Sequence, residues 1–322
     1  MVAGQSPEQD GARVTSRIPL VSIGMPVHNG ERFLSQALDS LLAQRHQDYE
    51  LIISDNASTD ATADICHGYT ARESRIRYLR LEAHRDAVGN FDHVLQAARG
   101  EYFMWAAADD LWEPLFISTL VDLLRSRADL VLAFSVFDVV DETEARIRTY
   151  RRLRETASPD RFRRLSNYLL QDDALGKANL IYGLMRRQAI LAAGGFRAWS
   201  AGVWGADMLV VFRLLSYGNL ALTDDLLFHK RLAIDAKEPP RRGIVEVARR
   251  HARGARAWYG YFAGYAHLIR IDEYLTALQK LLLQALLVRR ILSVGGAELQ
   301  RHVLARPQAG APTDSEHDAA GI

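Results

Sequence analysis

The sequence predicts an α/β fold in which helices flank a mostly parallel sheet. Short apolar runs alternate along the chain with segments whose apolar residues recur at helical spacing. Strands that alternate with helices of this length favour a parallel sheet with right-handed crossovers. The expected strands are 19–25, 50–54, 76–81, 102–106, 130–140 and 220–229, with a strand-like run at 178–185, and the expected helices are 31–44, 60–72, 90–99, 114–125, 188–193 and 206–217.

Turn residues and apolar stripes justify the elements of the first half. The first strand ends at Pro26, and His28-Asn29-Gly30 follows it as a turn. Helix 31–44 has apolar residues at i, i+3, i+4 and i+7. Asp55-Asn56-Ala57-Ser58 breaks the second strand, and Ser58 or Thr59 can cap the next helix. We therefore expect residues 18–140 to form a nucleotide-binding half of the domain.

The second half is less regular. Residues 141–164 are dense in arginine, which favours a solvated loop and helix face over an anion-binding patch. Residues 141–235 are expected to form the other half of the domain, and 236–305 a helical extension. Within that extension 274–292 is amphipathic, so it packs on the domain or on a second subunit, or else contacts a membrane surface. The polar ends, 1–17 and 306–322, are expected to be disordered.

Composition excludes several classes of protein. The net charge of +1 gives no argument for a nucleic-acid partner. The single cysteine, Cys66, excludes an internal disulfide and a thiolate metal cluster. The longest apolar run, 281–288, is too short to span a bilayer, and 1–17 lacks the apolar core of a signal peptide. We therefore expect a cytoplasmic protein, either free or peripheral at the inner face of the plasma membrane.

Two adjacent carboxylates carry the clearest chemical signal. The strand at 102–106 stops just before Asp109-Asp110. Side chains at the carboxyl end of such a strand point into the crevice where open α/β sheets bind ligands. Paired carboxylates suit a hard cation such as Mg²⁺, which usually bridges protein and substrate phosphates. This pattern points to an enzyme that handles a phosphorylated donor.

Four segments together resemble inverting family 2 glycosyltransferases, which have the GT-A nucleotide-sugar fold, a Rossmann-like sheet. The segments are the opening strand and loop at 21–30, the acidic loop at 54–60, the carboxylate region at 100–110 and the region around Asp207 at 204–207. They occur in the family's order, and the resemblance covers residues 19–232.

The resemblance implies a role for each matching residue. Nucleotide contacts are implied for Pro26, Val27, His28, Asp55, Asn56 and Asp109. A Mg²⁺ or Mn²⁺ site is implied with Asp110 as the principal ligand and Asp109 in support. The implied diphosphate contacts are His229 and Arg231, and the implied acceptor contacts are Asn179, Tyr182, Arg186 and Trp204. Asp207 would be the catalytic base. Many relatives carry a further carboxylate where this chain has Ala107 or Ala108, so the implied metal site is thinner here. His84 and Arg85 lie in the loop before Asn90, within possible reach of the donor, and are assigned no role.

The implied function is transfer of a sugar from a UDP- or dTDP-sugar to a saccharide or lipid-linked acceptor, in the synthesis of a bacterial-type surface polysaccharide. A sugar nucleotidyltransferase is a second interpretation, but residues 24–31 lack the Gly-rich, basic phosphate loop expected of one. A non-catalytic sugar- or protein-binding relative is the third, suggested only by the thin carboxylate site. A homo-oligomer formed through the C-terminal helices fits each interpretation.

Overall fold

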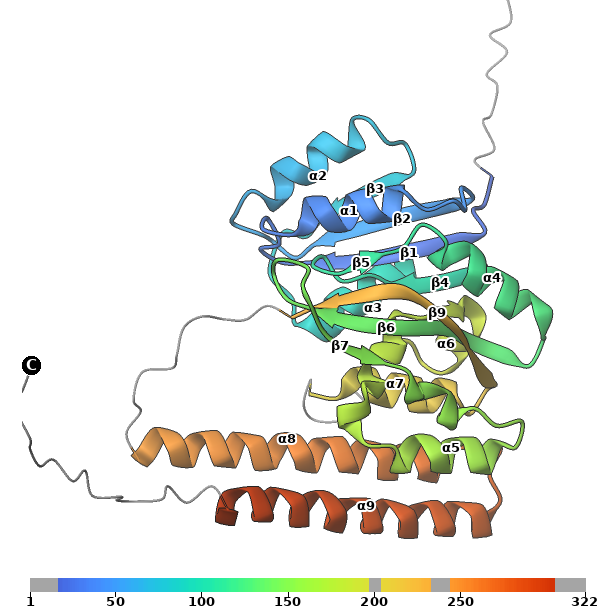
Figure 1. Cartoon of the computed structure of the whole chain (residues 1–322), viewed down its shortest axis with the longest axis vertical. Coiled ribbons are helices and arrows are strands. Elements are labelled where there is room, and N and C mark those ends of the chain that lie inside the picture. Colours follow the sequence, from blue (N-terminus) through green and yellow to red (C-terminus); the bar gives the residue numbers. More distant parts are fainter. Residues whose placement is uncertain (1–16, 197–203, 233–243, 305–322) are drawn as a thin grey trace, which may run out of the picture.

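One curved sheet forms the centre of the structure. The computed structural model describes residues 17–196, 204–232 and 244–304. Within these residues nine strands pair in the order β3-β2-β1-β4-β8-β6-β9-β5, with β7 beside β6 (Figure 1). The strands are β1 (Val21–Val27), β2 (Tyr49–Asp55), β3 (Ile76–Arg80), β4 (Tyr102–Trp105), β5 (Leu111–Trp112), β6 (Leu130–Val140), β7 (Arg146–Tyr150), β8 (Leu184–Arg186) and β9 (Asn219–Arg231). Among them β5, β7 and β8 run antiparallel to their neighbours, which confirms the expected mostly parallel α/β sheet.

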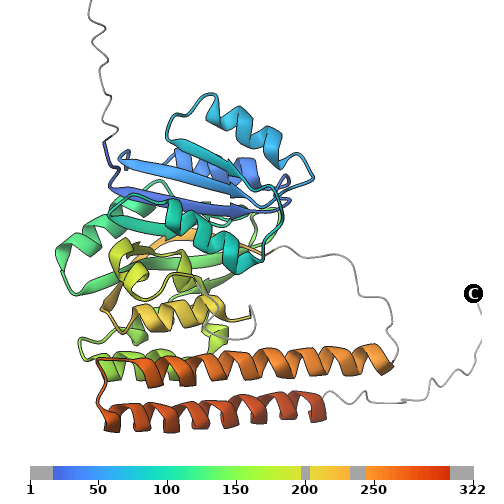
Figure 2. The ribbon, with the colours of Figure 1, turned by 180° about the vertical axis from the view of Figure 1, so that it is seen from behind.

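A reversal of the chain between β3 and β4 creates the place for a site. The helices α1 (Leu34–Leu42) and α2 (Thr62–Thr70) carry the chain outward from β1 to β3, and α3 (Ala87–Ala97) brings it back to β4. With right-handed crossovers α3 must lie on the opposite face from α1 and α2, and Figures 1 and 2 show this arrangement. The reversal leaves a crevice outside the carboxyl ends of β1 and β4, where open α/β sheets bind ligands.

The remaining helices cover the second half of the sheet and extend below it. They are α4 (Phe116–Ser126), α5 (Arg161–Leu170), α6 (Arg187–Ala192), α7 (Ala206–Leu214), α8 (Ile244–Ile271) and α9 (Ala277–Leu304). In both views α8 and α9 lie side by side at one end of the molecule, with α9 outermost. None of the described helices combines the length and the hydropathy that crossing a membrane would require.

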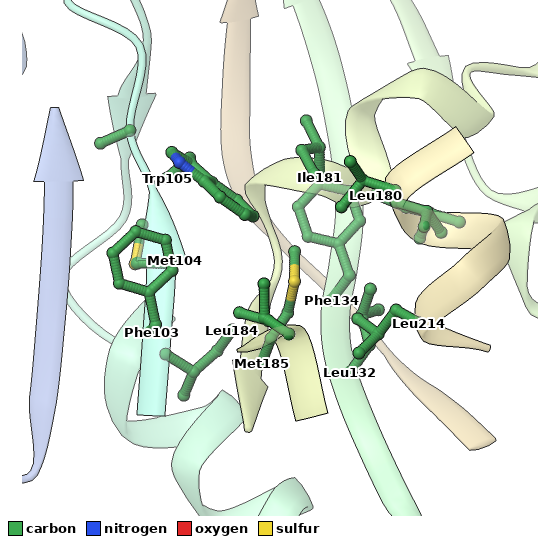
Figure 3. Packing of buried hydrophobic residues seen from close by; sticks show 14 of the residues in the cluster. Phe103, Met104, Trp105, Leu132, Phe134, Leu180, Ile181, Leu184, Met185 and Leu214 are labelled. Atoms are coloured by element: carbon green, nitrogen blue, oxygen red, sulfur yellow. The ribbon is translucent and has the colours of Figure 1, made fainter. Parts of the chain in front are cut away.

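The hydrophobic core is continuous through the sheet. Phe103, Met104 and Trp105 of β4 lie close to Leu184 and Met185 of β8, and all five side chains are buried (Figure 3). The buried faces of β6 and α7 extend the cluster, which explains why these elements read as nearly unbroken apolar runs.

Two expectations about the second half are corrected. Residues 178–185 are not a strand: Lys177–Tyr182 form a 3₁₀ helix that begins after Gly176 in the left-handed region (φ +83°), and only Leu184–Arg186 pair with the sheet. The arginine-rich segment, residues 141–164, contains the start of α5 and also an unexpected strand, β7. β8 covers only Leu132 and Ala133 on its side of the long strand β6, so the rest of that edge can pair with β7.

The predicted disordered ends lie outside the described residues, apart from Arg17.

Candidate active site

The first of two hollows lies at the reversal point of the sheet. It has a volume of about 390 Å³ and opens outside the carboxyl ends of β1 and β4. We call it the β1–β4 hollow. It is lined by Pro26, Val27, His28, Asn29, Gly30, Arg32, Phe33, Phe91, Ala107, Ala108 and Asp109. Four residues for which the resemblance implied nucleotide contacts, Pro26, Val27, His28 and Asp109, therefore face one cavity.

Asp55 and Asn56 shape the loop beside this hollow and are not among its lining residues. Both side chains are buried. The carboxylate of Asp55 accepts hydrogen bonds from the Ser58 amide (2.9 Å) and the Tyr78 hydroxyl (2.6 Å). Burial by itself would raise the pKa of Asp55, but these hydrogen bonds outweigh it and hold the pKa below its usual value. Direct contact of these two side chains with a nucleotide stays a prediction.

Asn56 also places two histidines near the hollow. Its side-chain amide donates to the Arg85 carbonyl (2.8 Å) and accepts from the Arg85 amide (2.7 Å), so both ends of the amide are used. The backbone carbonyl of Asn56 lies 2.9 Å from Nδ1 of His28, and the His28 and His84 rings meet edge to face at 4.5 Å. His84 is thus a site neighbour that no sequence signal assigned.

The two adjacent carboxylates point to different places. Asp110 is 0% exposed, and its oxygens accept hydrogen bonds from the Lys230 ammonium (3.0 Å) and the Arg231 amide (2.9 Å). Burial raises the pKa of Asp110 to about 7, against the lowering effect of Lys230. The Asp109 side chain is 38% exposed and lines the β1–β4 hollow. Asp109, not Asp110, presents its carboxylate to the hollow. Which of the two carboxylates is the principal metal ligand stays a prediction.

The end of β9 also differs from expectation. Side chains alternate along a strand, so Lys230 points away from the face that His229 and Arg231 share. Arg231 is buried and donates to the Asp109 carbonyl, the Glu142 carbonyl and the Gln36 side chain. His229 lies 3.0 Å from Glu113. Their predicted contact with a diphosphate does not fit this geometry. Lys230, 4.0 Å from Asp109, is the cation that sequence reasoning missed and strand alternation could have found.

A second hollow adjoins the first. It has a volume of about 490 Å³ and is called the α7 hollow here. Its lining residues are Ala87, Phe91, Ala178, Ile181, Tyr182, Phe196, Trp204, Gly205, Ala206, Asp207 and Met208. Phe91 lines both hollows, so the two cavities lie beside the same residue.

Two of the four residues predicted to contact the acceptor belong to this hollow, namely Tyr182 and Trp204. Asn179 donates to the Gly176 carbonyl within the 3₁₀ helix and is not among the lining residues. The predicted acceptor contact of Arg186 does not fit the structure. Arg186 pairs with Tyr102, the first residue of β4, at the end of the strand away from the hollows, and its side chain donates to the Leu130 carbonyl. β8 runs antiparallel to β4, which carries Arg186 away from the carboxyl ends of the parallel strands.

Asp207 is a carboxylate with few partners. It lies in the first turn of α7, and its Oδ1 accepts from the Met208 amide (2.8 Å). Burial raises the pKa of Asp207 above its usual value, and the nearby Asp173 raises it further. Burial also raises the pKa of Tyr182 to about 12; Lys230 opposes this shift, while Asp110, Asp207 and Asp109 add to it. Tyr182 therefore lies within electrostatic reach of acidic residues beside both hollows.

Gly205, the residue before α7, has a conformation and a close neighbour that favour glycine, and its replacement tests this. Gly205 has φ +77°, and an added Cβ would lie 2.5 Å from the Tyr261 ring of α8. We expect Gly205→Ala to cost roughly 1–3 kcal/mol of stability, measured by chemical denaturation. Gly68→Ala is the matched control, because a Cβ there meets nothing within 4 Å. Equal stability of the two variants would contradict the prediction.

Comparison with known proteins assigns a family to this arrangement. The family model described as Glycosyl transferase family 2 matches residues 22–181. The matched part begins in β1 and ends one residue before the last residue of the 3₁₀ helix Lys177–Tyr182. The chain carries a family 2 glycosyltransferase domain. This confirms the family that the four segments indicated; the match covers the first three segments and ends before the fourth, at 204–207.

Relatives and solved structures agree with this family 2 domain. The chain is 32% identical over 125 residues to the putative glycosyltransferase EpsE of Bacillus subtilis, and 30% identical over 115 residues to the putative teichuronic acid biosynthesis glycosyltransferase TuaG of the same organism. These matches span 38% and 36% of this chain and only 45% and 46% of those proteins. A crystal structure of S. aureus TarS 1-349 in complex with UDP-GlcNAc has a TM-score of 0.61 at 17% identity and covers 85% of this chain and 72% of that one, which shows a shared fold.

Proposed function

We propose that this protein is an inverting glycosyltransferase that moves a sugar from a nucleoside-diphosphate sugar to a hydroxyl group of an acceptor. The observation that carries the proposal is that the two hollows lie beside one residue, Phe91, which lines both. Asp109 lies on the wall of one hollow and Asp207 on the wall of the other. A donor in the first hollow and an acceptor in the second would bring a sugar and a hydroxyl together between two carboxylates.

The β1–β4 hollow is the proposed donor site. Its place at the reversal of strand order is where such sheets bind nucleotides, and TarS, which shares the fold, was crystallised with UDP-GlcNAc. The His28 ring and the apolar Pro26 and Val27 would contact the base and ribose, and Asp109 would lie toward the diphosphate. UDP- and dTDP-sugars are the donors we propose to test first.

We propose a divalent-ion site that uses one protein carboxylate, because the described residues contain no cluster of three or more His, Cys, Asp or Glu side chains that could hold an ion. Mg²⁺ keeps several waters and takes one or two carboxylates together with substrate phosphates. The Asp109 carboxylate is 38% exposed and lies 4.0 Å from Lys230, so an ion in the hollow can reach it, whereas both oxygens of Asp110 already accept hydrogen bonds. We propose that Asp109 holds Mg²⁺ or Mn²⁺ against the diphosphate, and that the ion, when bound, adds positive charge at the leaving group.

Lys230 and Asp207 would carry out the protein's part of the transfer. Burial by itself would lower the pKa of Lys230, but Tyr182, Asp110 and Asp109 raise it above the usual value, so the ammonium stays charged. A fixed cation beside Asp109 would stabilise the charge that develops on the departing diphosphate. On the other side Asp207 would take the proton of the acceptor hydroxyl as the new bond forms. Attack from the side opposite the leaving group inverts the anomeric carbon.

For the acceptor we propose a chemical class and not a particular molecule. An exposed Trp204 and a half-buried Tyr182 line the α7 hollow, and flat aromatic rings suit a sugar face. A saccharide or a lipid-linked saccharide in cell-surface polysaccharide synthesis is the acceptor class we propose. The name of TuaG, a relative in teichuronic acid biosynthesis, supports that setting.

A panel of nucleotide sugars tests the proposal. Ligands that bind the native state raise its melting temperature by mass action, so at least one UDP- or dTDP-sugar should stabilise the protein more than the free sugar does, and Mn²⁺ should enhance the shift. The same donor should be hydrolysed slowly without an acceptor. If no nucleotide sugar stabilises the protein or is turned over, the chain is better explained as a non-catalytic relative.

A further inference from the structure

The outer face of α9 exposes an unusual amount of apolar surface. Thirteen large hydrophobic side chains are exposed among the described residues, and seven of them lie between Tyr274 and Leu292. These seven are Tyr274 (48%), Leu278 (66%), Leu281 (67%), Leu282 (44%), Val288 (55%), Ile291 (38%) and Leu292 (71%). Tyr274 precedes α9 and packs on the Tyr217 ring and the Arg161 guanidinium, so six of the seven lie on α9 itself. Isolated exposed leucines are ordinary, but six large apolar side chains exposed on one helix mark a contact surface.

The cluster is a stripe along a helix that is already docked by its other side. Residues 278, 281, 282, 285, 288 and 292 recur at the spacing that places them on one helical face. Leu275, Leu283 and Leu287 are buried, and α9 packs on α5 and α8. A helix that is apolar on both sides needs a second apolar neighbour. In Figures 1 and 2 α9 is the outermost described layer, and no other described element covers its outer face.

The charge of this segment is one-sided. From Tyr274 to Ala297 the sequence contains Lys280, Arg289 and Arg290 and no acidic residue; Glu273 and Glu298 flank the segment. Arg290 turns inward, 3.3 Å from Asp173, and Lys280 donates to the Arg270 carbonyl. Arg289 is exposed, and its position, seven residues after Leu282, places it within the apolar stripe.

We propose that this stripe, from Leu278 to Leu292, docks on an anionic lipid surface, with α9 lying in the plane of the interface. An apolar face together with basic residues and no acidic residue between Tyr274 and Ala297 is the pattern that an interfacial helix carries. Such a contact would bury the apolar side chains and give Arg289 a phosphate partner. In a symmetric pair of α9 helices Arg289 would instead enter an apolar interface whose residues carry no carboxylate, and an unpaired buried charge is costly. The proposal is independent of the proposed function.

Vesicle co-sedimentation of the full chain tests the lipid contact. We expect the protein to sediment with phosphatidylcholine vesicles that contain phosphatidylglycerol, and much less with phosphatidylcholine alone. The triple variant Leu278→Gln, Leu281→Gln and Leu292→Gln should bind at least about tenfold more weakly. Arg289→Gln should weaken binding to the anionic vesicles about fivefold. Leu115→Gln with Ile147→Gln, two exposed residues elsewhere, is the matched control and should bind as the wild type does.

Two further measurements keep the result decisive. Thermal unfolding should show that all the variants remain folded, because every replaced side chain is exposed. Light scattering after gel filtration reports the oligomeric state. A wild-type dimer that the triple variant converts to a monomer, without vesicle binding, would overturn the proposal in favour of a second copy as the occupant. Absence of binding to anionic vesicles by a monomeric wild type would overturn it outright.

Discussion

Replacing Asp207 by Asn is expected to lower kcat roughly 10²–10⁴-fold, the usual contribution of a general base. Asn keeps the size of the side chain and can still accept from the Met208 amide, so the start of α7 should keep its geometry. Donor binding should change little, because Asp207 lines the α7 hollow and not the β1–β4 hollow. Steady-state transfer kinetics together with donor affinity from calorimetry measure both quantities.

The pH profile adds a second check on Asp207. A base must be deprotonated to act, so activity should fall as the pH drops through the pKa of Asp207. Burial raises that pKa, so the acid limb should lie at higher pH than an ordinary aspartate would give. Asp122→Asn, an exposed aspartate on α4, is the control and should leave kcat and the profile unchanged. A wild-type rate in Asp207→Asn would remove this residue from the mechanism.

Asp109→Asn is expected to lower kcat roughly 10²–10³-fold, because it removes the only Asp or Glu carboxylate that lines the β1–β4 hollow in the described residues. The Mn²⁺ concentration needed for half-maximal rate should rise, and the stability of the fold should change little because the side chain is partly exposed. Activity titrated with Mn²⁺ after treatment with EDTA measures the effect.

Asp110→Asn is the matched contrast to Asp109→Asn. It leaves the mostly buried Lys230 without its closest carboxylate, which should cost roughly 1–3 kcal/mol of stability. The variant should keep the wild-type Mn²⁺ dependence when assayed at a temperature where it is folded. If Asp110→Asn abolishes the response to Mn²⁺ while Asp109→Asn preserves it, the assignment implied by the family resemblance was right and the one drawn from the geometry is wrong.

The first half of the chain was predictable because its signals are local. β2 is buried along its whole length and has the apolar centre Leu51-Ile52-Ile53, and α1 carries a clear apolar stripe. The strands β5, β7 and β8 were missed or misjudged because each is short and depends on a long partner strand. β7 is arginine-rich and exposed at its start, so its only reason to be a strand is the open edge of β6.

The residues of the candidate site were likewise predictable only in part. Asp207 and Asp109 follow recognisable motifs, and the hollows contain both. Strand alternation shows that Lys230 and its two neighbours point to opposite faces of β9. Which of these faces is turned toward the site depends on the register of β9 against β5 and β6, which the sequence does not give.

The sequence by itself determined the α/β fold, the family and the stretch of chain that bears the carboxylates, because hydrophobic periodicity and motif order are properties of neighbouring residues. Only the tertiary structure decided which carboxylate reaches the hollow. Asp109 and Asp110 are adjacent and chemically identical, but Lys230 and the Arg231 amide, some 120 residues later in the chain, draw Asp110 into the interior. Burial and pairing of a charge depend on distant partners, and no local pattern records them.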